Sequence, residues 1–131
     1  MYPEQTLPAS IQQGPARRIA FPTSDGLHLV AVDDITYCSA DGNYTRVHLS
    51  NGTQMMISKT LGALDQILSL SHFIRVHQSY LVHTERIACL QQEQIILTCG
   101  TTIPVSRSRR AEVRQTVINN TQSITSNSEI Q

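Results

Sequence analysis

Short runs rich in β-branched and aromatic residues recur along most of this chain, and glycine-containing turns divide them. The pairs Asp25-Gly26, Asp41-Gly42 and Asn51-Gly52 are typical of tight hairpin turns. The runs fall at residues 19–21, 27–32, 35–39, 43–49, 54–57, 74–76, 80–82, 86–90, 94–99 and 102–104. Strands of this length, joined by such turns, predict a domain dominated by β-structure.

Two stretches break this pattern with helical periodicity. The first covers about residues 59–70, and Ser58 is its predicted N-cap. Its apolar stripe consists of Leu61, Leu64 and Leu68, with Ile67 beside them. The second begins near Arg107 and has Ser106 as its predicted cap. We therefore expect two short helices within the β-domain.

The two ends of the chain differ in composition from its middle. Residues 1–16 carry prolines and glutamines without periodicity. Residues 119–131 are mostly Asn, Thr, Ser and Gln, and such a composition does not offset the entropy of ordering. We expect a flexible arm over 1–16, one domain over 17–118, and a disordered polar tail over 119–131. The length of 131 residues suits a single compact domain of this kind.

The sequence carries no sign of a membrane or secreted protein. Hydrophobic residues make up 40% of it, but no apolar run approaches the roughly 20 residues that cross a bilayer. The first residues lack the basic-then-apolar order of a secretory signal. Cys38, Cys89 and Cys99 form an odd set, which predicts reduced thiols, each a small core residue. We expect a soluble cytoplasmic protein without membrane contact.

Charge is balanced over the whole chain but uneven along it. Lys and Arg number 10, and Asp and Glu number 10, so the net charge is zero. A zero net charge counts against a nucleic-acid partner as a first guess. Residues 107–114, however, contain several arginines and a single acid, Glu112. This local excess of positive charge forms a small basic region that would attract an anionic partner.

Arginines also occupy the start of the second predicted helix. Residues 104–110 read Pro-Val-Ser-Arg-Ser-Arg-Arg. The first turn of a helix carries unpaired N–H groups and a partial positive charge, so stability alone favours Asp or Glu there. Arginines in their place predict an anion site, and their planar donors match phosphate oxygens or the major-groove edge of guanine. A solvated basic turn and a small phosphate-bearing ligand stay open as alternatives.

Two other segments place polar side chains where nucleic acid could be contacted. Strict alternation in residues 43–49 puts Tyr44, Arg46 and His48 on one face. Residues 73–83 hold a polar cluster that consists of Arg75, His77, Gln78 and Ser79. The donors of this cluster suit phosphate oxygens, and the carboxamide of Gln78 suits the edge of a base. A solvent-facing strand and an ordinary loop are the alternative interpretations.

Taken together, these segments resemble the LytTR DNA-binding domain family. The resemblance rests on residues 35–37 continuing to 43–49, and on 60–68, 73–83 and 103–107, and it covers about residues 18–115. Its most specific piece is Phe-Ile-Arg-Val-His followed by Ser-Tyr-Leu-Val. The family implies a bacterial transcriptional regulator without catalytic activity. It also implies a mainly β fold, with short antiparallel strands in several small sheets and one or two short helices.

The resemblance further implies how this chain contacts double-stranded DNA. Loops would enter successive major grooves on one side of the duplex and read its sequence. The base-reading residues would be Asn43, Tyr44, Gln78 and Arg107. The residues that hold the DNA backbone would be Arg46, Lys59, Arg75, His77, Ser79, Ser106, Ser108, Arg109 and Arg110. No cofactor and no metal are expected.

The sequence departs from the family at two positions and in its length. The family often has a basic residue where Gln78 stands and an asparagine where His83 stands. It is commonly attached to a phosphoacceptor receiver domain, but the residues before Arg17 are too few for one. We therefore expect a stand-alone domain without a receiver. The resemblance further implies direct-repeat DNA sites and self-association of two molecules on them. A sensor kinase or another regulatory partner, so far unknown, would control it.

Two other classes of function were weighed. A metal-dependent enzyme could use His72, His77 and His83 with Cys89 or Cys99, but their spacing matches no familiar zinc pattern. A glycine-rich phosphate loop and a nucleophile elbow are both missing from the sequence. A non-catalytic module for protein or single-stranded nucleic acid would be expected to show stacking aromatics. The chain has Phe 2, Tyr 4 and Trp 0, which disfavours that module.

Overall fold

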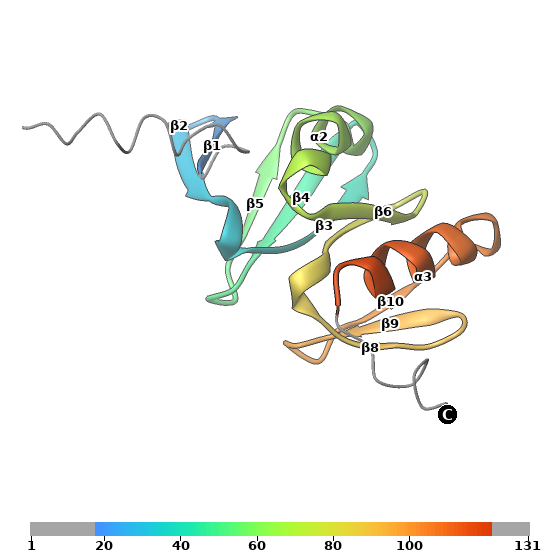
Figure 1. The fold of residues 1–131 in the computed structure, drawn as a ribbon. Helices are drawn as coiled ribbons and strands as arrows, with labels where there is room; N and C mark the ends of the chain where they lie inside the picture. Colours follow the sequence, from blue (N-terminus) through green and yellow to red (C-terminus); the bar gives the residue numbers. More distant parts are fainter. Residues whose placement is uncertain (1–17, 122–131) are drawn as a thin grey trace, which may run out of the picture.

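A computed structural model describes residues 18–121 of the chain (Figure 1). The predicted arm over 1–16 and residues 122–131 of the tail predicted over 119–131 lie outside the described residues. Within 18–121, strands β1 to β10 are accompanied by two short α-helices, named α2 and α3, and by single 3-10 turns. The predicted fold class, mainly β with several small antiparallel sheets, is confirmed.

Three antiparallel sheets form the described part of the domain. The central sheet has five strands in the order β5 (Gln54–Ile57), β4 (Tyr44–Leu49), β3 (Ile35–Asp41), β7 (Tyr80–His83) and β6 (Phe73–His77). A second sheet has the order β10 (Thr102–Pro104), β9 (Gln94–Leu97) and β8 (Ile87–Leu90). The third is a separate hairpin of β1 (Arg18–Thr23) and β2 (Gly26–Ala31).

Each predicted glycine-containing turn closes a hairpin. Asp41 pairs with Tyr44 across the β3–β4 turn, where Gly42 has φ 64°. Side chains disfavour this left-handed conformation, so a glycine suits the position. The β1–β2 hairpin closes with the pair Thr23 and Gly26. The β4–β5 turn, which contains Asn51-Gly52, is bridged by a 2.9 Å bond between backbone groups of Leu49 and Thr53.

The first predicted helix begins later than its sequence suggests. Helix α2 covers Leu61–Leu68, and its N-cap is Thr60, whose hydroxyl oxygen accepts a 3.2 Å bond from the Ala63 N–H. The prediction of Ser58 as the cap was therefore wrong. Both residues suit a cap chemically, but only Thr60 has the extended backbone directly before the helix and a hydroxyl that reaches its first turn. The predicted stripe of Leu61, Leu64 and Leu68 is buried.

The second helix begins in two stages. Residues Arg107–Arg109 form a 3-10 turn, η5, and helix α3 follows over Arg110–Asn119. Ser106 stands before η5 as predicted, but its side chain makes no capping hydrogen bond. Neither α2 nor α3, the helices of the described region, is long and apolar enough to cross a membrane.

Two hydrophobic cores lie on either side of the central sheet. The first fills the space beneath α2 and includes Val47, Leu64 and Leu81, which are at most 1% exposed. The second joins β6 and β7 to the three-stranded sheet and α3, and Val76 and Ile95 lie at its centre. Figure 1 shows α2 and α3 on different parts of the molecule; the buried residues of α2 belong to the first core and Val113 of α3 to the second. Residues of one sheet therefore serve both cores.

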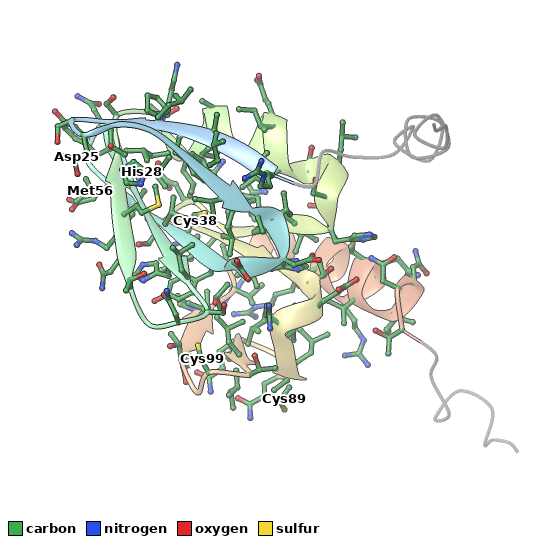
Figure 2. The ribbon with its side chains drawn as sticks, turned by 90° about the vertical axis from the view of Figure 1, so that its left-hand side faces the viewer. Asp25, His28, Cys38, Met56, Cys89 and Cys99 are labelled. Carbon is green, nitrogen blue, oxygen red and sulfur yellow. The ribbon has the colours of Figure 1, made fainter. Side chains whose placement is uncertain are left out.

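The cysteines separate into one buried and two exposed thiols, all of them free (Figure 2). Cys38 is 0% exposed and belongs to the first core, where burial raises the pKa of its thiol to about 12. Cys89 and Cys99 are exposed on the three-stranded sheet and its turn. The prediction that each cysteine is a core residue was thus right for Cys38 and wrong for the other two. Those two lie in short runs at the surface-facing side of a small sheet, where an apolar neighbourhood in sequence does not imply burial.

Candidate nucleic-acid interface

The turns that carry the predicted DNA-contacting residues lie along one edge of the central sheet. Antiparallel pairing places the β3–β4 turn beside the start of β7, and therefore beside the β6–β7 turn. The end of β5 lies beside the start of β4, so the segment after β5 joins the same edge. We call this the turn edge and define it by residues 41–44, 58–59, 77–80 and 106–110.

The β3–β4 turn presents two of the predicted base readers to solvent. Asn43 is exposed, and Tyr44 is 51% exposed. The side chains of β4 then alternate as predicted, because Thr45 and Val47 are fully buried. Tyr44 projects from the first position of a strand whose inward face is anchored in the core. Its position is therefore fixed by packing on the other face of the strand.

Arg46 is tied to its neighbours. Its Nη2 donates to Asp41 Oδ2 at 2.6 Å, and its Nη1 donates to Gln54 Oε1 at 3.1 Å. Both ionic partners are exposed, with side-chain exposures of 40% and 50%, so solvent screens this pair. Asp41 was identified from the sequence only as a turn residue. Its carboxylate reduces the positive charge of Arg46 at the turn edge.

Lys59 is positioned by a buried threonine. The Thr45 hydroxyl, which is 0% exposed, donates to the Lys59 carbonyl oxygen at 2.7 Å. This bond ties the segment between β5 and α2 to the start of β4 and leaves the lysine side chain exposed. Thr45 is not among the site residues predicted from the sequence. The sequence did contain a signal, because Thr45 is a polar residue on the inward face of an alternating strand. A polar side chain buried in this way is expected to make a hydrogen bond.

His48 is held on the sheet, away from the turn edge. Its ring stacks on Tyr37 with a centroid distance of 4.0 Å, and its Nε2 lies 3.1 Å from Ser39 Oγ. Burial lowers the pKa of His48, and the positive charge of Arg46 lowers it further. The predicted face of Tyr44, Arg46 and His48 exists, but Tyr44 is its most exposed member, Arg46 shares its charge with Asp41, and His48 is held on the sheet.

The β6–β7 turn has its backbone held from several directions. The Ala40 N–H donates to the Ser79 carbonyl at 2.9 Å, which connects this turn to the end of β3. The Ser79 N–H donates to His77 Nδ1 at 3.0 Å. A neutral His77 that accepts at Nδ1 carries its proton on Nε2, which is then available as a donor. Gln78 stands exposed at the tip of the turn.

Arg75 lies beneath this turn instead of in front of it. Its Nε donates to the His77 carbonyl at 3.1 Å, and its Nη2 donates to the Gln78 carbonyl at 2.6 Å. Its Nη1 is 3.8 Å from Asp65 Oδ2 on helix α2. The side chain is only 19% exposed. Arg75 thus contacts the turn and the helix with three of its nitrogen atoms.

The arginine segment joins the same edge through a bulge in β6. The pairing of β6 with β7 shifts between Arg75 and His77, and the Val76 carbonyl there accepts a 2.9 Å bond from the Ser106 N–H. Arg107 and Ser108 follow directly and are exposed. The bulge therefore places the start of η5 beside the β6–β7 turn.

The last two residues of the segment are less free. Arg109 and Arg110 are half-buried. Within residues 18–121, Ser106 Oγ and Arg110 Nε are buried without a hydrogen-bond partner. Arg110 also lines a hollow together with Arg114, one helical turn away, and with the exposed amides of Gln91 and Gln92. This hollow extends the positive surface from the turn edge onto α3.

Charge is polarised across the central sheet. Among residues 18–121, the turn edge carries Lys59, Arg107, Arg109 and Arg110 against the single acid Asp41, whereas Asp33, Asp34 and Glu85 lie near the opposite edge, where β3 starts and β7 ends, against the base Arg86. A zero net charge therefore conceals a basic edge and an acidic one. An anion approaching the molecule is attracted toward the basic edge.

Comparison with known proteins decides the family. The chain matches the sequence model of the LytTr DNA-binding domain over residues 25–118. The chain belongs to this family. The family assignment made from the sequence is therefore confirmed. The fold agrees as well: the structure is similar to the LytTr DNA-binding domain of a methyl-accepting/DNA response regulator from Bacillus cereus, with a TM-score of 0.67 at 21% identity, covering 79% of this chain and 98% of that one.

Curated relatives of this LytTr domain are bacterial regulators. It is 29% identical over 103 residues to the Sensory transduction protein LytT of Bacillus subtilis, covering 75% of this chain and 42% of that protein. It is 30% identical over 115 residues to the Positive alginate biosynthesis regulatory protein of Pseudomonas aeruginosa, covering 82% of this chain and 46% of that protein. The chain thus spans less than half the length of these curated relatives.

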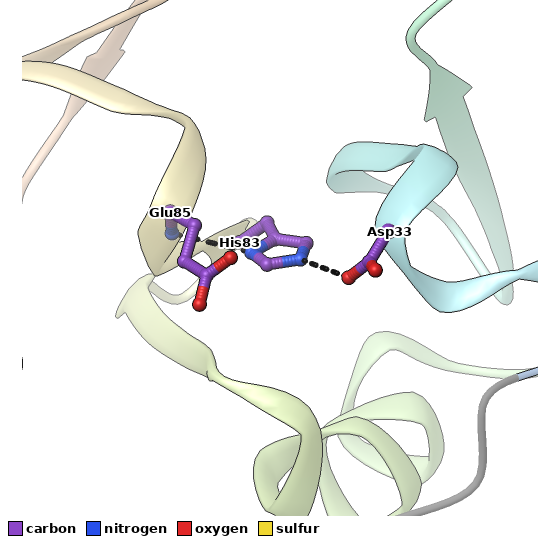
Figure 3. A group of neighbouring side chains, drawn as sticks. All are labelled: Asp33, His83 and Glu85. Carbon is purple, nitrogen blue, oxygen red and sulfur yellow. Dashed lines mark hydrogen bonds and ion pairs between the residues drawn. The ribbon is translucent and has the colours of Figure 1, made fainter.

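The alternative metal set is not assembled by the LytTr fold. Within residues 18–121 the candidate ligand cluster is Asp33, His83 and Glu85, whose ligand atoms lie within 4.8 Å of one another (Figure 3). His83 Nδ1 accepts a 3.2 Å bond from the Glu85 N–H, so the proton of the neutral ring sits on Nε2, 3.6 Å from Asp33 Oδ1. Metal binding at Nε2 would move that proton to Nδ1, against a backbone donor. This cluster therefore suits a structural hydrogen-bond link better than a metal.

Proposed function

We propose that this LytTr domain binds double-stranded DNA in a sequence-specific manner through the turn edge and thereby regulates transcription. One observation carries the proposal: separate turns with the expected side chains lie on a single edge and are bonded to each other. The Ala40–Ser79 bond connects the first two turns, and the Ser106–Val76 bond connects the second to the arginine segment. Side chains held at fixed relative positions can match a regular duplex.

Four exposed side chains serve as base readers in this proposal. Arg107 presents a planar guanidinium that suits the O6 and N7 acceptors of guanine. Gln78 and Asn43 carry carboxamides that suit the N6 and N7 groups of adenine. Tyr44 adds an aromatic ring with a hydroxyl beside Asn43. Since these residues come from three different turns, they would meet successive stretches of the major groove.

A second set of side chains holds the phosphates and fixes the register. Lys59 and Arg109 supply positive charge, and the His77 Nε2–H supplies a neutral donor. The remaining members of this set are Arg46, Ser79, Ser108 and Arg110. Ser106, also expected here from the sequence, has a buried Oγ and an N–H bonded to Val76, so it positions the segment instead. Arg46 contributes less than a free arginine, because Asp41 shares its charge. These contacts carry affinity without reading sequence.

We further propose that two copies occupy direct-repeat sites, self-associate there and answer to an upstream regulatory partner such as a sensor kinase. The relatives named as sensory transduction and regulatory proteins support a place in signal-controlled transcription. The family itself is described by DNA binding and not by a reaction, which supports a non-enzymatic role. The polarised charge favours approach of DNA to one edge only.

The proposal is tested by selecting bound fragments from random duplexes with the full chain. We expect the selection to enrich a sequence motif. The affinity for that motif should fall as salt rises, with a slope that corresponds to about four to six phosphate contacts. The selected site as a single strand should bind less well than the duplex. Equal or tighter binding of the single strand would replace this function with a single-strand module. No enrichment and no salt dependence would refute DNA recognition altogether.

Arg107→Ala should be the most informative single change at the turn edge. Loss of its guanidinium should weaken binding of the selected duplex by about 1–3 kcal/mol and relax preference at one or two base pairs. Repeating the selection with the variant measures both effects. Lys59→Ala is the matched control: it should weaken all sequences equally and lower the salt slope by about one contact. If Arg107→Ala leaves motif and affinity intact, Arg107 is not a base reader.

A further inference from the structure

The backbone of the β6–β7 turn depends on Arg75 for its shape. Two neighbouring carbonyls of this turn, those of His77 and Gln78, both accept from the same guanidinium, at 3.1 Å and 2.6 Å. The Ser79 N–H and carbonyl are bonded elsewhere, to His77 and Ala40. Removing Arg75 would therefore leave two adjacent carbonyls of the turn without their partner and would loosen the backbone around them, including the Ser79 N–H bond to His77.

Arg75 is poorly placed to bind a phosphate. Its Nε and Nη2 are directed at the turn, and its Nη1 faces Asp65 Oδ2 at 3.8 Å. The negative charge of Asp65 partly neutralises the positive charge of the Arg75 guanidinium. The Arg75 side chain is also only 19% exposed. A residue that binds the phosphates of the DNA backbone should instead present a solvent-exposed donor, as Lys59 does.

We propose that Arg75 is a positioning residue that sets the base preference of Gln78, with Asp65 of α2 as its anchor. The inference rests on the proposed function, because it assigns Arg75 a role in reading DNA without touching it. Arg75 holds the carbonyl of Gln78 itself, so the guanidinium fixes the point from which that side chain leaves the turn. Asp65 then connects this geometry to helix α2 and the first core.

The two possible roles of Arg75 give different salt dependences. A phosphate contact releases counterions, so its loss lowers the salt slope by about one contact and leaves base preference intact. Loss of a positioning residue leaves the slope unchanged and relaxes the base pairs read by Gln78. Arg75→Lys separates the roles further: it keeps the charge but loses the fork that reaches two carbonyls.

The experiment uses the full chain and the duplex enriched by selection. Gln78→Ala first identifies the base pairs that this turn reads. Arg75→Lys and Arg75→Ala should both reduce discrimination at those pairs by about 5- to 150-fold, the range of one bidentate base contact, with an unchanged salt slope. Neither should reduce it further in a Gln78→Ala background. Arg86→Lys is the matched control, since Arg86 also donates to a carbonyl, that of Asp33, at the opposite edge.

A measurement without DNA keeps the two proposals separable. Amide hydrogen exchange of Ser79 should be at least several-fold faster in Arg75→Lys than in the parent and unchanged in Arg86→Lys. A lowered salt slope with intact preference, or an unchanged Ser79 exchange rate, would overturn the positioning role. If the parent chain fails to bind any duplex, the proposed function fails, while faster Ser79 exchange would still support the structural role of Arg75.

Discussion

At the residue scale, burial decides which side chains can react and which can only pack. Cys38 is 0% exposed, in contact with the apolar interior beneath α2, and its thiol pKa is raised to about 12 because burial disfavours the thiolate. Cys89 and Cys99 are exposed. Only the thiolate is a good nucleophile, so accessibility and pKa act in the same direction at Cys38.

Alkylation of the native protein with iodoacetamide near neutral pH should therefore modify Cys89 and Cys99 and spare Cys38. The physical reason is that Cys38 is both closed to the reagent and held in its neutral form. Peptide mass spectrometry before and after denaturation checks the result. In denaturant, Cys38 should be modified as readily as the others. Rapid labelling of Cys38 in the folded state would contradict the packing of the first core.

At the scale of elements, local signals predicted most strands and turns correctly. The strands at 54–57 and 102–104 have the same bounds in the structure. The predicted run at 94–99 ends earlier, at Leu97, because the Leu97 N–H bonds to the Thr101 carbonyl and starts the β9–β10 turn. Composition alone does not show such a bond, since it depends on the partner strand.

The assembly of the turn edge followed from contacts distant in sequence. The residues of the three turns were selected from the sequence as candidates for DNA contact. The bond from Ala40 to Ser79 and the bulge at Val76 that receives Ser106 were not predicted, because each joins segments that no local pattern relates. The same limit applies to Arg75, whose guanidinium suits a phosphate by its chemistry. Only the three-dimensional structure shows that its Nε and Nη2 donate to carbonyls of the β6–β7 turn instead.

The start of α2 gives a direct test of element-scale reasoning. Thr60→Ala removes the hydroxyl that accepts from the Ala63 N–H, so the free energy of unfolding should fall by about 0.5–2 kcal/mol. Ser58→Ala is the control, and it should change stability by less than about 0.5 kcal/mol because Ser58 is exposed and lies before the cap. Urea denaturation measures both. A larger loss for Ser58→Ala would restore the cap that the sequence alone suggested.

At the scale of the whole molecule, His83 links the first core to the strand that leads to the second sheet, on the side opposite the turn edge. His83 is 1% exposed, packs on Phe73 of the first core at a centroid distance of 4.6 Å, and ends the strand that leads to the second sheet. Arg86 donates to the Asp33 carbonyl beside it. The His83 ring therefore links the segment before β3 to the segment before β8: it accepts a hydrogen bond from the Glu85 N–H, and its Nε2 lies 3.6 Å from Asp33 Oδ1.

This connection should make stability depend on pH. Burial lowers the pKa of His83 below its ordinary 6.5, although Asp33 partly opposes it, and burial lowers that of His48 too. The folded state then binds fewer protons than the unfolded one, so stability is full above about pH 6.5 and falls below it. Urea unfolding between about pH 7.5 and 5.5, above most carboxyl titration, measures the loss. His83→Asn should flatten the dependence, whereas the exposed His28→Asn should not; equal slopes in both would contradict a buried neutral His83.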